Sequence, residues 1–315
     1  MKPQNYNEII IQKVKEKLPK NHLLVNYLMD TLIIDREPAY RRIRGAVPFS
    51  FEEVVKLSKD LSISIDNMVE QSSSNNVVQF AVKTIDDFDN ANEMYINMLK
   101  EELARMEKLI NAKNVEIMVG YNRIYWRFFY CPLLFKGDYF RFLLSQNAID
   151  ISVKFSSIEV PQEIMKLYQQ IRNCNLKLKN LTVIWESRMF YKIVSEIKKF
   201  HQSHFLSDED VAEIKKELLS FLDLIATSKA KWDIYICDIS IDTNCIHCIF
   251  DDNEFVQYNI YSEAPVIVWN NKTVSKMQRR WFEKYKKASQ QISGTNAFFG
   301  SKFYNEMMDF INSEL

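Results

Sequence analysis

The first 70 residues consist of short apolar segments at helical spacing, separated by strong start and stop signals. Pro19 ends the first segment, and Ser50 with Glu53 has the spacing of a capping box, which starts the fourth. Signals this close together allow only short helices. The sequence therefore predicts an all-α domain over residues 1–70, with helices at about 9–18, 24–32, 36–44, 51–61 and 66–69.

The third of these helices carries four arginines in nine residues. Asp35 has the side-chain type of an N-cap, Pro38 lies in the first turn, where few amide donors are needed, and Gly45 suits the C′ position. Ala39 and Ile43 are spaced i, i+4 and should face inward, with Arg42 beside them at the edge. The expected outward residues are then Arg36, Glu37, Tyr40, Arg41 and Arg44.

Residues 22–70 resemble the helix-turn-helix domain of the phage-repressor (Cro, Xre-like) family. The resemblance lies in the apolar second helix, Asp35-Arg36 and Arg44-Gly45 at the two ends of the third, and the run Leu61 to Asp66 before the fifth. Ile33 stands where the family usually has glycine, and His22 or Asn26 lies near the family's glutamine position. A β-branched residue would be strained at positive φ, so the sequence leaves open whether the turn keeps the family's geometry.

The resemblance implies binding to double-stranded DNA. Arg36, Glu37 and Arg41 would face base edges, while Arg44, Tyr40 and Asn26 would contact phosphates. It also implies a homodimer, because proteins of this type bind paired half-sites. The alternatives are a helical protein-interaction module with a solvated arginine face, or a degenerate remnant of a DNA-binding domain.

A polar stretch centred on residues 72–76 predicts a linker over 71–92, followed by a domain over 93–315. A helix at about 90–111 carries apolar residues spaced 3, 4, 3, 4, as in about two heptads. That helix either packs on its own domain or forms a dimer seam. The seam residues are Ile96, Leu99, Leu103, Met106 and Ile110.

Beyond residue 112, strand patterns alternate with helical ones, which predicts a larger mixed α/β domain. The expected strands are at 115–119, 181–185, 232–239, 245–250, 255–261 and 266–269. The expected helices are at 188–201, 207–226, 277–289 and 303–310. The basic runs 276–280 and 284–287 are expected to form the solvated face of an amphipathic helix, with a DNA contact as the alternative.

Composition narrows the function classes. The 41 Lys and Arg balance the 41 Asp and Glu, which excludes a generally basic nucleic-acid coat, so DNA contacts must come from a local patch. Only five glycines are present and no phosphate-cradling loop is found. Residues 1–20 lack the apolar core of a signal peptide, and no apolar run approaches the roughly 20 residues of a membrane helix. The cysteines number five, an odd count that does not suit a framework of paired disulfides. These features predict a cytoplasmic protein with reduced thiols and no membrane partner.

No pattern of catalytic, metal-binding or cofactor-binding residues stands out. Cys245, His247 and Cys248 have metal-ligand side chains, but alternation along a strand puts Cys248 on the opposite face. His201 and His204 end a helix, and Cys131 and Cys174 lack a recognisable partner. The aromatic residues of 125–140 are expected to be core rather than an apolar ligand pocket.

Together these features predict a DNA-binding transcriptional regulator that is not an enzyme and has no cofactor. Its larger domain would dimerise and sense an unknown small-molecule effector. The alternative is an enzyme whose active site lies within residues 113–315. A cluster of polar groups with perturbed pKa values in a pocket of that region would favour the enzyme.

Overall fold

The computed structural model describes residues 5–18, 23–61, 65, 86, 88–123, 131–150, 152–227, 232–261, 264–293 and 297–315. The chain divides into two compact units, residues 1–79 and 80–315. The division falls inside the predicted linker, 71–92. The last helix predicted for the first domain, at 66–69, lies outside the described residues.

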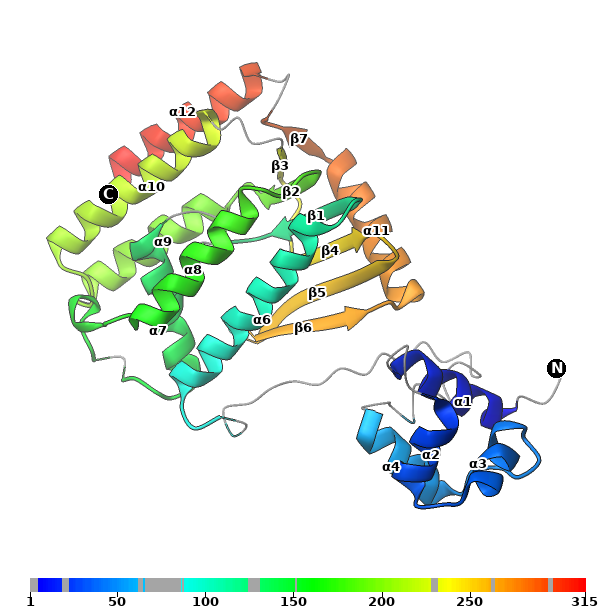
Figure 1. Cartoon of the computed structure of the whole chain (residues 1–315). Coiled ribbons are helices and arrows are strands. Elements are labelled where there is room, and N and C mark those ends of the chain that lie inside the picture. Colours follow the sequence, from blue (N-terminus) through cyan, green and yellow to red (C-terminus); the bar gives the residue numbers. More distant parts are fainter. Residues whose placement is uncertain are drawn as a thin grey trace. The chain divides into compact units, whose positions relative to one another are not determined.

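Within its described residues, unit 1 consists of short helices around one core (Figure 1). Each helix contributes one side chain that is exposed by 1% or less: Val14, Leu28, Ala39 and Leu57. One shared core of this kind makes the four helices interdependent. They are α1 (Tyr6–Lys17), α2 (Leu24–Leu32), α3 (Arg36–Ile43) and α4 (Phe51–Leu61).

Unit 2 is a mixed α/β fold, as predicted. Its helices are α6 (Ala91–Asn111), α7 (Pro132–Ser145), η3 (Phe155–Ser157), α8 (Gln162–Asn175), α9 (Met189–Gln202), α10 (Asp208–Thr227), α11 (Lys272–Lys287) and α12 (Ala297–Glu314). Its strands are β1 (Val115–Tyr121), β2 (Leu181–Glu186), β3 (Trp232–Cys237), β4 (Cys245–Phe250), β5 (Asn253–Tyr261), β6 (Ala264–Trp269) and β7 (Ser289–Gln291).

The strands form one sheet in the order β6-β5-β4-β1-β2-β3-β7. Strands β1, β2 and β3 are parallel neighbours, whereas β4, β5, β6 and β7 each pair antiparallel with the strands beside them. The long connections through α7, α8, α9 and α10 allow the parallel part, since parallel strands need a crossover. Short connections at Asp251 and after Tyr261 suit the antiparallel part.

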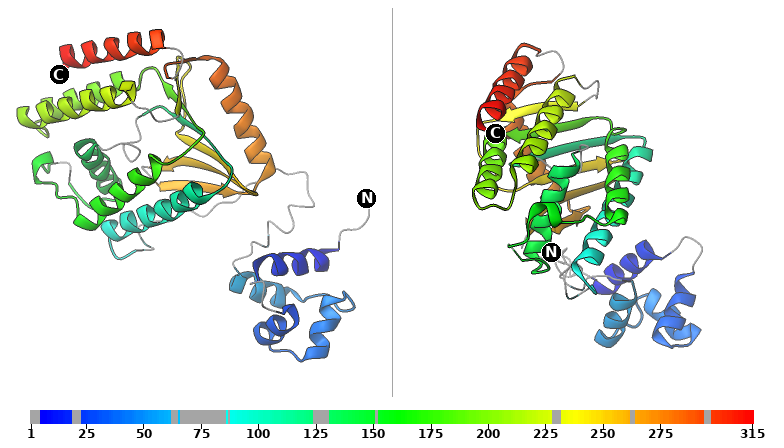
Figure 2. Two further views of the ribbon diagram at one scale, coloured as in Figure 1. Left: turned by 45° about the horizontal axis from the view of Figure 1, so that its top comes forward. Right: turned by 90° about the vertical axis from the view of Figure 1, so that its left-hand side faces the viewer.

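The two faces of the sheet are covered unequally. Along β1, Ile117, Val119 and Tyr121 join the large core beneath α6 to α10 and α12, while Met118 faces the smaller cluster beneath α11. Figures 1 and 2 show α11 on one side of the sheet and the other helices of this unit on the opposite side. In the described residues, α11 is thus the one helix that covers its face.

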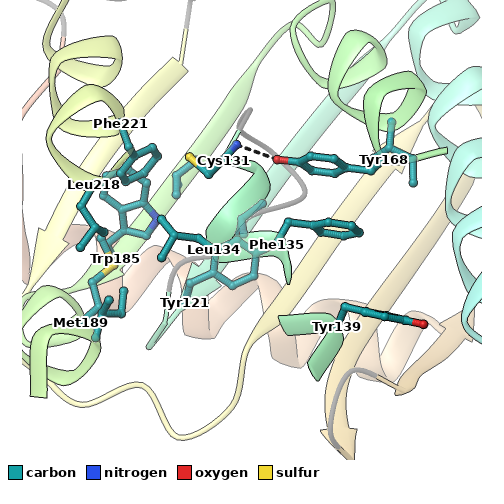
Figure 3. Close-up of a cluster of buried hydrophobic side chains, with 14 of the residues drawn as sticks. Tyr121, Cys131, Leu134, Phe135, Tyr139, Tyr168, Trp185, Met189, Leu218 and Phe221 are labelled. Carbon is teal, nitrogen blue, oxygen red and sulfur yellow. Dashed lines mark hydrogen bonds between the residues drawn. The ribbon is translucent and has the colours of Figure 1, made fainter. Parts of the chain in front are cut away.

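Aromatic side chains fill the large core (Figure 3). Phe135 stacks on Tyr168 with ring centroids 4.1 Å apart, and the Tyr168 hydroxyl accepts a 2.7 Å hydrogen bond from the Cys131 amide. Residues 135 to 140 of the predicted aromatic belt include Phe135, Tyr139 and Phe140, all exposed by 2% or less. This part of the belt is core, as predicted, while residues 124–130 lie outside the described residues.

Helix α6 packs along α8 inside its own unit. Of the predicted heptad seam, Leu99 and Met106 are buried in the large core, and Ile96, Leu103 and Ile110 pack against it partly buried. Each described contact of the seam is therefore made within unit 2. This agrees with the alternative in which the helix packs on its own domain.

Candidate nucleic-acid interface

The turn between α2 and α3 is left-handed at Ile33, whose φ and ψ are both 54°. The Ile34 amide donates to the Met29 carbonyl at 3.2 Å, a bond that closes the end of α2 in the manner of a Schellman motif. The Ile33 side chain is 87% exposed, so no packing compensates for the unfavourable backbone conformation. The chain thus keeps a geometry that usually calls for glycine.

Helix α3 begins and ends near the predicted residues. Asp35 occupies the N-cap position, but its side chain accepts no capping hydrogen bond, so that detail of the prediction is wrong. The Asp35 carbonyl accepts the first hydrogen bond of the helix, from the Ala39 amide at 3.1 Å. At the other end Gly45 has φ 73°, and the Ala46 amide donates to the Arg41 carbonyl at 2.9 Å. The predicted glycine stop is confirmed.

Arg42 ties α3 to the start of α4. Its Nε and Nη2 atoms donate to the two carboxylate oxygens of Glu53 at 3.0 and 2.5 Å, and Nη1 donates to the Pro38 carbonyl at 3.2 Å. Glu53 also accepts from the Ser50 amide at 2.9 Å, and the Glu53 amide donates to Ser50 Oγ at 3.2 Å. The predicted capping box is confirmed. Partial burial opposes ionisation of Glu53, but these donors outweigh it and hold the pKa of Glu53 below its usual value.

Asn7 of α1 fixes the far end of α3. Its Nδ2 donates to the Arg42 carbonyl at 2.9 Å, and its Oδ1 accepts from the Phe49 amide at 3.1 Å. Only 8% of Asn7 is exposed. This contact was not predicted, because its partners are 35 and 42 residues away and no local pattern signals it.

The predicted outward face of α3 is exposed as expected. Arg36 lies over the Tyr40 ring at 5.8 Å, and Arg44 pairs with Glu37 at 2.9 Å. Side chains of this pair are 62% and 71% exposed, so the pair orients Arg44 more than it stabilises the fold. Arg41 is exposed on α3, and Asn26 is exposed on α2. The face therefore presents three guanidinium groups, two of them already oriented by a neighbour.

This charge is local. Residues 5–61 contain nine Lys and Arg (13, 15, 17, 36, 41, 42, 44, 56, 59) against eight Asp and Glu (8, 16, 30, 35, 37, 52, 53, 60). Four of the nine cations lie in or next to α3, and the other five are divided between α1 and α4. A nearly neutral unit with its arginines on one short helix matches a patch better than a basic coat.

The five cysteines are free and buried. Burial raises the pKa of Cys245 and of Cys248 to about 12 and also raises the pKa values of Cys131 and Cys174. Cys245 faces α11 and Cys248 faces the large core, as strand alternation predicted. Within the described residues, no three His, Cys, Asp or Glu side chains are grouped to hold a metal ion.

A polar cluster lies between the sheet and α11. His247 Nε2 is 2.7 Å from Ser275 Oγ, and the Ser275 hydroxyl donates to Glu254. Ser275 and Glu254 line an open hollow of about 530 Å³, whereas His247 is fully buried behind them. Desolvation lowers the pKa of His247, and the neighbouring charges are those of Glu254, Arg279 and Glu116. The imidazole therefore stays neutral near pH 7.

An apolar cavity lies among α7, α9 and the aromatic side chains Phe140, Phe155 and Phe205. Its volume is about 50 Å³. Pockets for drug-sized ligands measure about 300–1,000 Å³. This cavity can hold only a very small molecule in the conformation described.

No helix in the described part of the chain is long and apolar enough to cross a membrane. The search for relatives found no matching family model, no similar curated protein and no similar solved structure.

Proposed function

We propose that the protein is a DNA-binding transcriptional regulator with a helix-turn-helix domain of the Cro/Xre-like type, and that α3 enters the major groove. The observation that carries the proposal is the division of labour on α3. Ala39 is buried and Arg42 is bound to Glu53, which leaves Arg36, Arg41 and Arg44 facing outward. Unit 2 would control DNA occupancy through an unidentified small-molecule effector.

The proposed roles follow from side-chain chemistry. Arg36 and Arg41 would donate to guanine, and Glu37 would accept from cytosine once it is released from Arg44. Tyr40, Arg44 and Asn26 would donate to phosphates, which fixes the register of the protein on the duplex. Arg42 is left without a role at the DNA, because its guanidinium is committed to Glu53.

A binding titration tests this function. The full chain is mixed with fragments selected from genomic DNA, and affinity is measured by gel shift across a salt series. Arg41→Ala should weaken binding by about 5- to 150-fold if the guanidinium reads a base, because such contacts contribute about 1–3 kcal/mol. Lys59→Ala is the control, since Lys59 is exposed on α4, away from α3. If the chain does not bind these fragments at low salt, or if its affinity does not fall as salt rises, the proposed function is refuted.

The proposal includes a homodimer, and the edges of the sheet suggest its surface. Among the described residues, β6 and β7 each pair on one side only. Strand β7 has three residues, whereas β6 has six, of sequence APVIVW, with no charge. A long uncharged edge strand invites pairing with another strand. We propose that β6 pairs antiparallel with β6 of a second copy.

The hydrogen-bond alternation of β6 supports this surface. The Asn270 amide donates to the Glu254 carbonyl of the β5 side at 2.9 Å. Alternation in an antiparallel ladder then turns the backbone groups of Ile267 and Trp269 outward. Pro265 belongs to the same outward set, which is where a sheet tolerates a residue without an amide proton.

Light scattering tests the dimer. Ile267→Pro removes an outward donor and leaves the β5 ladder intact, so it should convert the dimer to a monomer. Ile267→Val keeps the donor and should leave the dimer unchanged. A wild-type chain that is monomeric at micromolar concentration contradicts the proposed surface.

The enzyme alternative is favoured by one observation, the His247–Ser275–Glu254 cluster at the hollow. Activation of a serine requires a histidine that accepts its proton and is oriented by a third group. Here the serine proton goes to Glu254, and Nδ1 of His247 has no hydrogen-bond partner within the described residues. Covalent labelling of Ser275 by a fluorophosphonate probe, lost in Ser275→Ala, would favour the enzyme; we expect no labelling.

A further inference from the structure

Helix α11 is the most strongly charged helix that the proposed function leaves unused. It carries seven Lys and Arg and one Glu in 16 residues of a chain with no net charge. Its opposite side is buried against the sheet through Val274, Gln278 and Phe282. The charge is therefore presented by a helix whose apolar side is already in use.

The seating of α11 fixes which way its cations point. The Trp281 ring lies over Gly120 of β1 so closely that a Cβ at Gly120 would come within 2.9 Å of it. The Tyr258 hydroxyl donates to Gln278 at 2.8 Å, and Gln278 donates to the Cys245 sulfur at 3.3 Å. These contacts hold the helix against rotation about its own axis.

Five of the cations form a stripe, which is named the α11 stripe below. Successive residues on a helix are about 100° apart, so residues four apart fall almost in line. The members lie within an arc of about 120° on the side opposite Gln278 and span about 22 Å of the axis. They are Lys272, Lys276, Arg280, Lys284 and Lys287, and all are exposed.

Ion pairs neutralise the neighbours of the stripe rather than the stripe itself. Arg279 pairs with Glu116 at 3.4 Å and with Glu283 at 3.6 Å, and Lys286 lies over the Tyr235 ring at 5.0 Å. The five stripe residues have no ion pair or ring contact within the described parts of the chain. At the N-terminal end, Asp251, Asp252 and Glu254 line the hollow that Lys272 and Lys276 share. Glu283 lies within the same arc, but its carboxylate pairs with Arg279. The part of the stripe away from the hollow is therefore Arg280, Lys284 and Lys287.

We infer that the α11 stripe binds the phosphate backbone of double-stranded DNA and gives the protein a second, sequence-independent contact. The inference rests on the proposed function for the identity of the ligand. A membrane surface fits less well, because an interfacial helix needs a free apolar face and that of α11 is packed on the sheet. An acidic protein also fits less well, because protein interfaces centre on buried aromatic or apolar anchors. Met277 is the one large apolar side chain exposed on α11.

The test uses the full chain and a short random-sequence DNA duplex, with affinity measured by fluorescence anisotropy from about 50 to about 200 mM salt. The variant Arg280→Gln/Lys284→Gln/Lys287→Gln should lower the salt slope by about 3, since each phosphate contact contributes about 0.9. Its affinity should then fall about 40-fold less than that of the wild type over this salt range. The control, Lys108→Gln/Lys166→Gln/Lys199→Gln, removes three exposed cations from α6, α8 and α9 and should leave the slope unchanged.

Comparison with Arg41→Ala/Arg44→Ala separates this inference from the proposed function. If only the α3 variant weakens binding, the α11 contact is refuted and the proposed function stands. If only the α11 variant does so, the stripe binds DNA and α3 makes no phosphate contact, which contradicts the role of Arg44 in the proposed function. Binding of wild-type chain to vesicles rich in anionic lipid but not to the duplex would overturn both. Unchanged thermal unfolding of the exposed-residue variants confirms that they fold.

Discussion

The two basic helices, α3 and α11, use their cations differently. Helix α3 has eight residues and four basic side chains in and next to it, all arginines, and three of these contact a neighbour: Arg42 with Glu53, Arg44 with Glu37 and Arg36 with Tyr40. Helix α11 has 16 residues, five lysines and two arginines, and its outermost cations are unpaired within the described residues.

The difference matches two kinds of recognition. A guanidinium that is already oriented has a fixed fork of donors, which suits the edge of a base. A flexible ammonium is a point charge, which suits a phosphate whose exact position varies along the duplex. On this comparison α3 would supply specificity, and α11 would supply affinity that depends on salt.

The largest expected effect tests whether one arginine of α3 is structural. Arg42→Ala should lower the free energy of unfolding of unit 1 by about 2 kcal/mol, because it leaves the half-buried Glu53 carboxylate without its charged donor. Arg41→Ala, on the exposed side, should change it by less than about 0.5 kcal/mol. Urea unfolding followed by hydrogen exchange of α3 amides measures both. Equal effects of the two changes would contradict the division of labour on α3.

Local rules predicted much of α3 and its surroundings. The capping box at Ser50 and Glu53, the stop at Gly45 and the inward position of Ala39 follow from spacing within one or two turns. The outward set of arginines follows from the same helical spacing. What was missed is non-local: the Asn7 clamp and the Arg42–Glu53 pair join separate helices, and nothing in their own segments signals them.

The same limit applies to unit 2. Six of its strands were predicted from sequence patterns, but their order in the sheet was not. Strand β1 lies between β2 and β4, and its pairing residues in those strands are 64 or more positions away along the chain. Helix α8 is absent from the prediction although Ile164, Leu167, Tyr168 and Ile171 have helical spacing and are all buried. That signal was present and could have been used. Strand β7 has three residues, too few for a pattern.

The second prediction concerns the protonation of His247, which contacts Ser275 of α11. His247 is neutral in the folded state because desolvation lowers its pKa, while in the unfolded chain it titrates near about 6.5. As pH falls below that value the unfolded chain binds the proton first, so unit 2 loses about 1.4 kcal/mol for each unit by which folding lowers the pKa. The loss begins below about pH 6.5 and ends at the folded pKa.

Substitution isolates this contribution. His247→Gln retains a donor for Ser275 and should reduce the fall in unfolding free energy between pH 7 and pH 5. His204→Asn is the control, because His204 is exposed and asparagine tolerates its positive φ of 59°. A pH dependence that is the same in both variants would show that His247 does not couple α11 to protonation.

The smallest expected effect concerns the turn that presents α3. Ile33→Gly should raise the free energy of unfolding of unit 1 by about 0.5–1 kcal/mol. It removes a left-handed strain of about 1–2 kcal/mol, and the greater freedom of glycine in the unfolded chain offsets part of that gain. Since the Ile33 side chain is 87% exposed, little packing is lost.

Ile33→Ala is the matched control: it removes the same apolar surface but keeps a Cβ in the left-handed conformation, so it should gain less. Urea unfolding measures both variants, and an equal gain in both would attribute the effect to the exposed side chain rather than to the backbone. The DNA affinity of Ile33→Gly should stay unchanged, because glycine keeps the geometry that orients α3; a loss of affinity would instead indicate that Ile33 itself contacts the DNA.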